Sequence, residues 1–376
     1  MTFNAVQPID GSVYGAAIHE NTQIEVHEAI SRAKKVAKEF ASLSPKATAE
    51  LLRTIAESLE GKRESLVASA CAETGLPEGR IGGEITRTTV QFKLFANLVE
   101  TGRHLRVVID KADPNYSPAP RPDIRRQNQP LGVIAIFAAS NFPLAFSVAG
   151  GDTASALAAG CPVVVKGHSA HPGTGEIVAQ AIDAAVKACG MPAGVFSLVQ
   201  GGKRDVGEAL VQHPLIKAVG FTGSLGGGRA LFDLCARRPD PIPFFGELGS
   251  VNPMFLLPAA LGARSDAIAT GWAGSLTMGA GQFCTNPGIA VVIDGADAQA
   301  FIDAAKAAVA KVGAQTMLTD GIAEAYRHGR DRIAGAAGVR EVLTSMCDQR
   351  QATPYLFEVS GSDWLANHAL GEEVFG

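Results

Sequence analysis

Apolar and charged residues alternate along the first hundred residues at the three- and four-residue spacing of amphipathic helices. Two stretches carry the pattern, NTQIEVHEAISRAKKVAKEFASL and PKATAELLRTIAESLEGKRESLVASACAETG. Asn21 suits the start of the first helix, Ser44 followed by Pro45 suits the start of the second, and Gly75 suits its end. The pattern predicts a layer of helices that packs against another part of the molecule.

The pattern changes at residues 106–129, which read RVVIDKADPNYSPAPRPDIRRQNQ and are rich in proline and polar residues. The short extended pieces indicate either a linker or a pair of strands that projects from the body. From Gly132 onward, runs rich in Val, Ile and Phe alternate with helical stretches of small residues. The runs are GVIAIFA, PVVVK, GVFSLVQ, KAVGFTG and PIPFFGE.

This alternation is typical of βαβ units, which build a buried parallel sheet. Because such crossovers are almost always right-handed, we predict an α/β fold with a doubly wound sheet and helices on both faces. Ligands of these sheets bind outside the carboxyl ends of the strands. Each run here ends in a polar or glycine-rich cluster, and five such clusters in register favour a ligand crevice, although a single polar loop is ordinary. The clusters are SNFP, KGHS, GGKR, TGS and ELG.

Two of these clusters suit a phosphate-bearing ligand. The glycines of FTGSLGGGRA let backbone N–H groups approach an anion at a helix start, although the segment is not a GxGxxG motif and the signal is weak. Lys166 ends an apolar strand, where it faces either a ribose or phosphate group or water. A carboxylate at this strand end favours a ribose 2′-hydroxyl, whereas KGHS has none and Arg204 follows the next strand, which favours a 2′-phosphate.

Composition narrows the class of protein. The chain has 376 residues, 47% hydrophobic residues and a net charge of −4, which suit a globular protein of two or three domains without the basic footprint of nucleic-acid binding. The N-terminus lacks the features of a signal peptide and no long apolar run follows, so we expect a cytoplasmic protein with small-molecule partners and no membrane contact. The six cysteines form no CxxC pair, so neither a metal site nor a disulfide framework is indicated.

Three residues suit covalent catalysis. Cys284 lies in GAGQFCTNPG, whose glycines and proline place it on a loop rather than inside a helix or strand. Glu247 follows PIPFFG, an apolar setting that raises the pKa of a carboxyl group and suits it to accept a proton. Asn141 follows the first strand, and its amide suits stabilisation of an oxyanion. The alternatives are a structural cysteine, a solvated carboxylate and an asparagine in a turn before Pro143.

The motifs ASNFP, VVVKGHSAHPGTGE, GFTGS, ELGS, GQFCTNPG and EEVFG, in this order, resemble the aldehyde dehydrogenase superfamily. The resemblance covers essentially the whole chain, and KGHSAHPG is similar to the NADP-preferring branch that includes 2,5-dioxopentanoate (α-ketoglutarate semialdehyde) dehydrogenases and a bacterial fatty-aldehyde dehydrogenase. It implies a Rossmann-like cofactor domain, a second α/β catalytic domain and a projecting β arm. The corresponding ranges are 1–105 with 130–247, then 248–376, and 106–129 for the arm, which implies a homo-dimer or homo-tetramer.

The resemblance also implies catalytic roles. Cys284 matches the nucleophile that forms a thiohemiacetal and then a thioester, Asn141 with the Cys284 backbone N–H matches the oxyanion hole, and Glu247 matches the base that activates water. Ser250, where the family usually has glycine, is expected to be a minor departure. Family chains continue beyond EEVFG, so the resemblance implies that the catalytic domain is incomplete at its C-terminal side.

Cofactor roles follow from the same resemblance. Lys166 matches a ribose ligand, Ser169 stands where NAD-preferring members carry a carboxylate, and Arg204 is the candidate partner of the 2′-phosphate of NADP, with NAD as the alternative. Glu373 and Phe375 match the residues that position the nicotinamide ribose and ring. The remaining cofactor positions are Phe221, Thr222, Gly223, Ser224 and Leu248.

The expected reaction is NAD(P)-dependent oxidation of 2,5-dioxopentanoate to 2-oxoglutarate, with a fatty or other aldehyde as the alternative substrate. Arg87 is a candidate for the substrate carboxylate, and Gln91 and Phe92 lie on the same predicted helix, where they line either a substrate tunnel or the core. Two rival functions remain, a cofactor-independent thiol esterase or acyltransferase and a non-catalytic relative.

Overall fold

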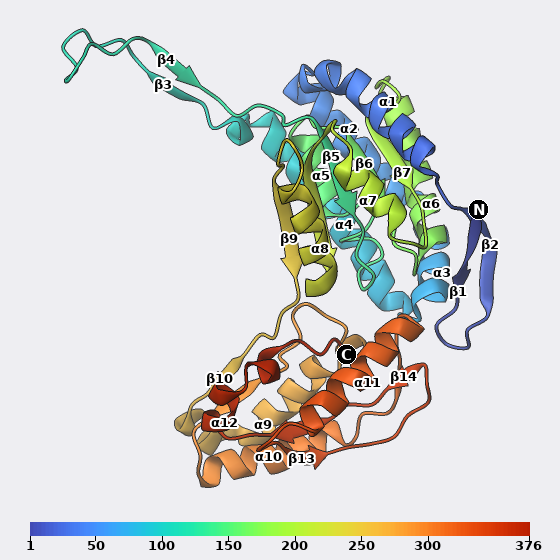
Figure 1. Ribbon diagram of the computed structural model, residues 1–376, viewed down its shortest axis with the longest axis vertical. Helices are drawn as coiled ribbons and strands as arrows, with labels where there is room; N and C mark the ends of the chain where they lie inside the picture. The colour runs from blue at the N-terminus through green and yellow to red at the C-terminus, as the bar shows by residue number, and fades with distance from the viewer. The chain divides into compact units, whose positions relative to one another are not determined.

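The computed structural model describes all 376 residues, which form two compact units (Figure 1). Unit 1 comprises residues 1–5, 15–71 and 77–247, and unit 2 comprises residues 6–14, 72–76 and 248–376. Each unit has hydrophobic clusters of its own. Two short N-terminal segments therefore pack with unit 2, which the sequence pattern does not anticipate.

The predicted helical layer is confirmed. Thr22, and not Asn21, caps the first helix: its hydroxyl accepts the Glu25 N–H while the Glu25 side chain accepts the Thr22 N–H. Ser44 caps the second helix as predicted, and Gly75 follows the third with a left-handed φ of 68°. The helices are α1 (Gln23–Ala41), α2 (Pro45–Glu60), α3 (Arg63–Thr74) and α4 (Glu78–Glu100).

A hairpin that the sequence analysis missed precedes these helices. Its strands, β1 (Thr2–Val6) and β2 (Val13–His19), pair only with each other. Most of their side chains are exposed, so the sequence carries little of the apolar alternation that marks a half-buried strand.

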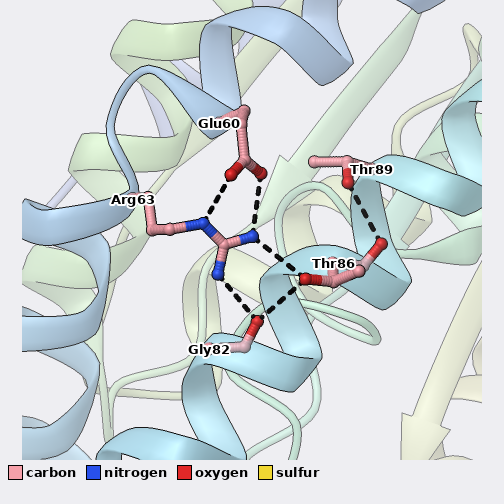
Figure 2. Close-up of polar contacts among 5 residues, drawn as sticks. All are labelled: Glu60, Arg63, Gly82, Thr86 and Thr89. Atoms are coloured by element: carbon pink, nitrogen blue, oxygen red, sulfur yellow. Dashed lines mark hydrogen bonds and ion pairs between the residues drawn. The ribbon is translucent and has the colours of Figure 1, made fainter.

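Arg63 joins three helices of the layer through its guanidinium group (Figure 2). The group bridges both carboxylate oxygens of Glu60 at the end of α2 and donates to the Gly82 carbonyl (2.9 Å) and the Thr86 hydroxyl (3.0 Å) on α4. The Arg63 bond lowers the pKa of Glu60. These bonds fix the start of α3 against α4, and the pair itself adds little stability because both side chains are partly exposed.

The five predicted runs form one sheet in the order β7-β6-β5-β8-β9. β5 lies in the middle and pairs in parallel with β6 and β8, and β6 pairs in parallel with β7. Strand order therefore reverses beside β5, which is the switch point at which such sheets bind ligands. The strands are β5 (Val133–Phe137), β6 (Val163–Lys166), β7 (Phe196–Val199), β8 (Ile216–Gly223) and β9 (Phe244–Leu248).

Helices cover both faces of this sheet, so the predicted doubly wound α/β fold is confirmed. Alternate residues of β5, namely Val133, Ala135 and Phe137, are buried in one cluster with residues of α1, α7 and α8. Ile134 and Ile136 point to the opposite face, where α5 and α6 contact the strands and α2 packs behind them. The connecting helices are α5 (Gly151–Ala158), α6 (Pro172–Ala188), α7 (Asp205–Gln212) and α8 (Leu225–Ala236).

The proline-rich segment forms a hairpin rather than an unstructured linker. β3 (Val108–Asp110) pairs antiparallel with β4 (Ile124–Arg126), and all six residues are exposed. Figure 1 shows this hairpin extending away from the helices of unit 1. It follows the short helix η1 (Arg103–Leu105).

Unit 2 is built from helices and two-stranded sheets. β10 (Met254–Leu256) pairs in parallel with β11 (Ala290–Val292), and α9 (Pro258–Leu276) packs with α10 (Ala296–Val309) around Trp272 and Phe301. A second cluster surrounds Tyr326 on α11 (Asp320–Ala334). No helix of the protein is both long and apolar enough to cross a bilayer. The other elements are η2 (Met278–Gly281), β12 (Gln315–Thr316), β13 (Arg340–Leu343), β14 (Gln351–Ala352), β15 (Leu356–Glu358), α12 (Gly361–Ala366) and η3 (His368–Gly371).

Candidate active site

Asn141 lies in the turn that directly follows β5, as the strand-end rule predicts. The residue is half-buried, and its backbone carbonyl accepts a bond from the Arg80 guanidinium group at 3.3 Å. The same guanidinium group lies 4.5 Å from the centre of the buried Phe142 ring. The N-terminal half of α4 thus holds the turn from one side.

Glu84 anchors this turn more firmly. It is only 4% exposed, and its Oε1 accepts the backbone N–H groups of Leu144 (2.8 Å) and Ala145 (2.9 Å), while Arg80 donates to its Oε2 at 3.3 Å. Burial raises the pKa of Glu84, and the two N–H bonds and Arg80 oppose this shift. The sequence analysis missed Glu84, although a glutamate between Ile81 and Ile85 on the apolar face of a helix is the available signal.

Lys166 ends β6, and its ammonium group donates to the Gly201 carbonyl at 2.8 Å. Burial lowers the pKa of Lys166 to about 8. His168 nearby is held neutral, because burial and the adjacent His171 and Lys166 lower its pKa well below its usual range. A primary amine and a neutral imidazole therefore stand at this strand end.

Ser169 and Arg204 are both exposed and follow the adjacent strands β6 and β7, so they lie at the same edge of the sheet. A carboxylate also reaches this edge. Glu20, from the end of the N-terminal hairpin, accepts the Gly202 N–H at 3.1 Å, and its charge acts on Lys166. The sequence analysis counted only residues that follow β6, so it missed this acid.

The GFTGS motif spans the end of β8 and the start of α8. The Ser224 hydroxyl caps the helix by accepting the Gly227 N–H at 3.3 Å. The centre of the Phe221 ring lies 6.1 Å from those of Phe137 and Phe244, and this half-buried ring packs against the core cluster. Among the motif's residues, Thr222, Gly223 and Ser224 are those placed at the strand end.

Glu247 lies on β9 and is exposed, so the prediction that PIPFFG encloses it is wrong. The Phe244 side chain points to the opposite face of the strand, and Phe245, which shares the face of Glu247, is itself 62% exposed. A second acid, Asp152 on α5, lies close by. Its carboxylate lies against Gly220, where an added Cβ would be 2.9 Å from Oδ2, and desolvation together with the charge of Glu247 raises the pKa of Asp152.

Cys284 lies on a loop after η2, as predicted, in a half-buried position, and its thiol forms no disulfide bond. Three consecutive residues before it have left-handed backbone: Gly279 (φ 58°), Ala280 (φ 57°) and Gly281 (φ 73°). Such a run ends the preceding helix and is rare for residues other than glycine. The glycines of GAGQFC are therefore required by the path of the chain.

Side-chain amides hold the Cys284 loop. The Asn252 Nδ2 group donates to the carbonyls of Cys284 (2.7 Å) and Asn286 (3.0 Å), and the Ser250 hydroxyl also donates to the Cys284 carbonyl. Asn286 in turn donates to the carbonyls of Leu276 (3.0 Å) and Gly281 (2.8 Å). A glycine at position 250 would have no hydroxyl to make this contact.

The EEVFG segment approaches the same part of unit 2. The Glu373 carboxylate accepts the Ser250 N–H and lies 2.7 Å from where a Cβ on Gly249 would be, and burial raises its pKa. A cavity of about 800 Å³ within unit 2 is lined by Ser250, Phe283, Asn286, Glu373 and Phe375. Ser250 thus links the Cys284 carbonyl to Glu373, and Glu373 and Phe375 line one cavity, whereas Leu248 ends β9.

The residues at the strand ends of unit 1 suit a dinucleotide. Lys166, Ser169 and Arg204 offer hydroxyl and cationic donors, and Gly223 with Ser224 starts a helix whose N–H groups favour an anion. The donor set therefore fits the phosphates and riboses of NAD(P), while Glu20 adds an acceptor for a hydroxyl group.

Comparisons with known proteins agree with this chemistry. The model of the aldehyde dehydrogenase family matches residues 1–323. Alpha-ketoglutaric semialdehyde dehydrogenase 2 of Azospirillum brasilense is 51% identical over 98% of this chain and 70% of its own length. The alpha-ketoglutaric semialdehyde dehydrogenase of Acinetobacter baylyi is 41% identical over 100% of this chain and 72% of its own length.

A solved structure shows the same fold. The NAD-dependent benzaldehyde dehydrogenase of Corynebacterium glutamicum superposes with a TM-score of 0.82 at 26% identity, covering 100% of this chain and 79% of that one. Sequence and fold lead to one conclusion: the chain belongs to the aldehyde dehydrogenase family, whose members oxidise aldehydes to carboxylic acids with NAD or NADP.

Proposed function

We propose that this protein oxidises an aldehyde through a thioester on Cys284, with Asn141 and Glu247 as its catalytic partners. The observation that carries the proposal is the Cys284 loop, which side-chain amides hold outside any helix or strand. A core cysteine has no need of such a loop.

The steps assign each group one task. The Cys284 thiolate attacks the carbonyl carbon, and the new oxyanion accepts bonds from the Asn141 amide and the Cys284 backbone N–H. NAD(P), held by Lys166, Ser169 and Arg204, would supply the acceptor for the hydride that leaves this carbon, and loss of the hydride would give the thioester on Cys284. Glu247 takes a proton from water, the resulting hydroxide attacks the thioester, and the acid departs as the Cys284 thiolate returns.

The substrate we favour is α-ketoglutaric semialdehyde (2,5-dioxopentanoate), on which the two similar relatives are named. Its carboxylate needs a cation, and Arg87 is exposed with its guanidinium group 5.5 Å from the ring centre of Phe142, the neighbour of Asn141. Phe92 is fully buried in the core, so it does not line a tunnel, and Gln91 lies against Gly151.

Kinetics with a panel of semialdehydes and fatty aldehydes test this assignment. We expect the highest kcat/KM for 2,5-dioxopentanoate, and Arg87→Ala should raise its KM at least tenfold while leaving the KM of an uncharged aldehyde unchanged. Equal kcat/KM for acidic and fatty aldehydes would contradict the substrate assignment.

Cys284→Ala tests the reaction class. It should lower turnover by on the order of 10⁴-fold or more, with the far-UV circular dichroism and Tm of the parent protein. Ester cleavage in the absence of any aldehyde-dependent cofactor reduction would favour a thiol esterase or acyltransferase. A folded protein with neither activity would favour a non-catalytic relative.

The preferred cofactor is NADP. Ser169 in place of an acid and the exposed Arg204 support this preference, whereas Glu20 at the same edge opposes it. Titration calorimetry should give a lower Kd for NADP than for NAD. Arg204→Ala should reduce the ratio of the Kd for NAD to the Kd for NADP, and Glu20→Gln should increase it. Tighter binding of NAD than of NADP, with the same ratio in Arg204→Ala, would contradict the preference.

The protein acts as a homo-dimer or homo-tetramer through the exposed β3–β4 hairpin. Both strands of the hairpin have one edge without a partner, and such edges pair readily with another chain. Light scattering after size exclusion measures the mass, and deletion of residues 108–126 should reduce it. An unchanged mass would show that the hairpin is not the contact.

A further inference from the structure

We propose that Asn252 is a positioning residue for Cys284, a role that rests on the proposed function of Cys284 as the nucleophile. The Asn252 amide donates to two carbonyls of the loop, those of Cys284 at 2.7 Å and of Asn286 at 3.0 Å. One side chain therefore fixes the backbone on both sides of Thr285, and with it the direction in which the Cys284 side chain leaves the chain.

The groups around the Asn252 side chain require a hydrogen-bond donor at this position. The Cys284 carbonyl accepts two bonds, from Asn252 and from Ser250, so both of its lone pairs are used. The Ser250 hydroxyl is also within 3.4 Å of the Asn252 amide. An acceptor at position 252 would face the two carbonyl oxygens and repel them.

The backbone at Asn252 shows that the side chain has been placed there at a conformational cost. Its φ of 37° is left-handed, a region that asparagine, aspartate and glycine tolerate far better than other residues. Asn252 sits after ELGSV, in the link between β9 and β10, where its side chain reaches the Cys284 loop. The strained link brings the amide to the carbonyls of Cys284 and Asn286.

The left-handed backbone at Asn252 also limits which substitutions can test its role. Asn252→Asp keeps the size and the backbone preference but replaces the donor with a carboxylate, and Asn252→Gly keeps the backbone and removes the side chain. Asn252→Ala would confuse the loss of the amide with a strained backbone. Asn4→Asp, at an exposed position of β1, is the control for the added charge.

The readout separates positioning from mere stability. The rate of the first turnover, measured as the burst of reduced cofactor in stopped flow, should fall roughly tenfold to a hundredfold in Asn252→Asp, and less in Asn252→Gly. The Kd of the cofactor should stay the same. Alkylation of Cys284 by iodoacetamide without substrate, followed by peptide mass spectrometry, should slow by a similar factor.

Some results would overturn the proposed role of Asn252. An unchanged burst and unchanged alkylation in both Asn252 variants, with only a lower Tm, would overturn the proposal and leave Asn252 a structural residue. Turnover that survives Cys284→Ala would instead refute the proposed function, so the two failures are told apart. Ser250→Gly should slow the burst less than Asn252→Asp, because the Asn252 bond to the carbonyl remains.

Discussion

The turn that carries Asn141 and the loop that carries Cys284 are both irregular backbone, and different hydrogen bonds hold each of them in place. The Asn141 turn follows a fully buried strand of the central sheet, and a buried carboxylate on α4 holds its backbone N–H groups. The Cys284 loop follows three left-handed residues, and side-chain amides hold its carbonyls. The turn is therefore fixed through its backbone N–H donors, and the loop is fixed through its backbone carbonyl acceptors.

This difference predicts what a substitution in each region would change. The turn depends on one buried acid in a dense core, so its loss costs stability. The loop depends on a few partly exposed amides, so their loss costs precision at the thiol while the fold of unit 2 persists.

Of the variants that follow, Glu247→Gln is expected to have the largest effect. Loss of the base should slow thioester hydrolysis by about 10²–10⁴-fold, because an amide cannot accept the proton of water. The burst of reduced cofactor should remain, since Glu247 takes no part in the attack by Cys284. Stopped-flow and steady-state rates measure the two steps, and a burst lost together with turnover would show that the steps are not divided in this way.

Glu84→Leu should destabilise unit 1. It leaves the N–H groups of Leu144 and Ala145 buried without an acceptor, at about 1–3 kcal/mol for each group. Urea unfolding measures the loss, and Glu84→Gln should lose less because its carbonyl oxygen still accepts both bonds. Stability equal to the parent in Glu84→Leu would mean that the turn does not depend on this acid. By contrast, we expect Asn252→Asp to keep most of its stability.

Lys166 should make cofactor binding sensitive to pH. Its pKa is lowered to about 8, so the charged form is present below this pH and is lost as the pH rises through it. Cofactor affinity should therefore fall above pH 8, by up to about tenfold per pH unit. Lys166→Arg stays charged and should bind with a flat profile, and a flat profile in the parent would contradict the assignment of Lys166.

The smallest effect is expected at the start of α1. Thr22→Ala removes the capping box of α1 and should cost about 1 kcal/mol of unfolding free energy. Thermal unfolding measures it, with kcat unchanged as the control. A change in kcat would show that the helical layer is coupled to catalysis.

The two regions also differ in how far the sequence predicts them. The place of Asn141 followed from the strand-end rule, because a run such as VIAIF has few alternatives to a buried strand. The Cys284 loop was predicted to be a loop, but Asn252 and Ser250 were not linked to it. These contacts join residues more than thirty positions apart through irregular backbone, for which no periodic pattern exists.

The sequence pattern also did not predict two acidic side chains that reach the candidate residues from distant parts of the chain. Glu20 reaches Gly202 and acts on Lys166, and Asp152 on α5 lies beside Glu247, although neither is near its partner in sequence. Glu247 was expected in an apolar setting because its neighbours are phenylalanines, whereas strand alternation turns Phe244 to the opposite face and Phe245 is itself exposed. Local composition predicts the element well and the electrostatic surroundings poorly.

The strand order has a consequence for how the chain leaves the ribosome. β5 is the first strand of the five to be synthesised and the one in the middle, and half of its ladder waits for β8 at residues 216–223. Until then only β6, at residues 163–166, is available to pair with it. Such long-range closure raises the contact order and slows folding, so the nascent sheet exposes an apolar edge during elongation. Chaperone binding should therefore be strongest on ribosome-bound chains that end between β6 and β8.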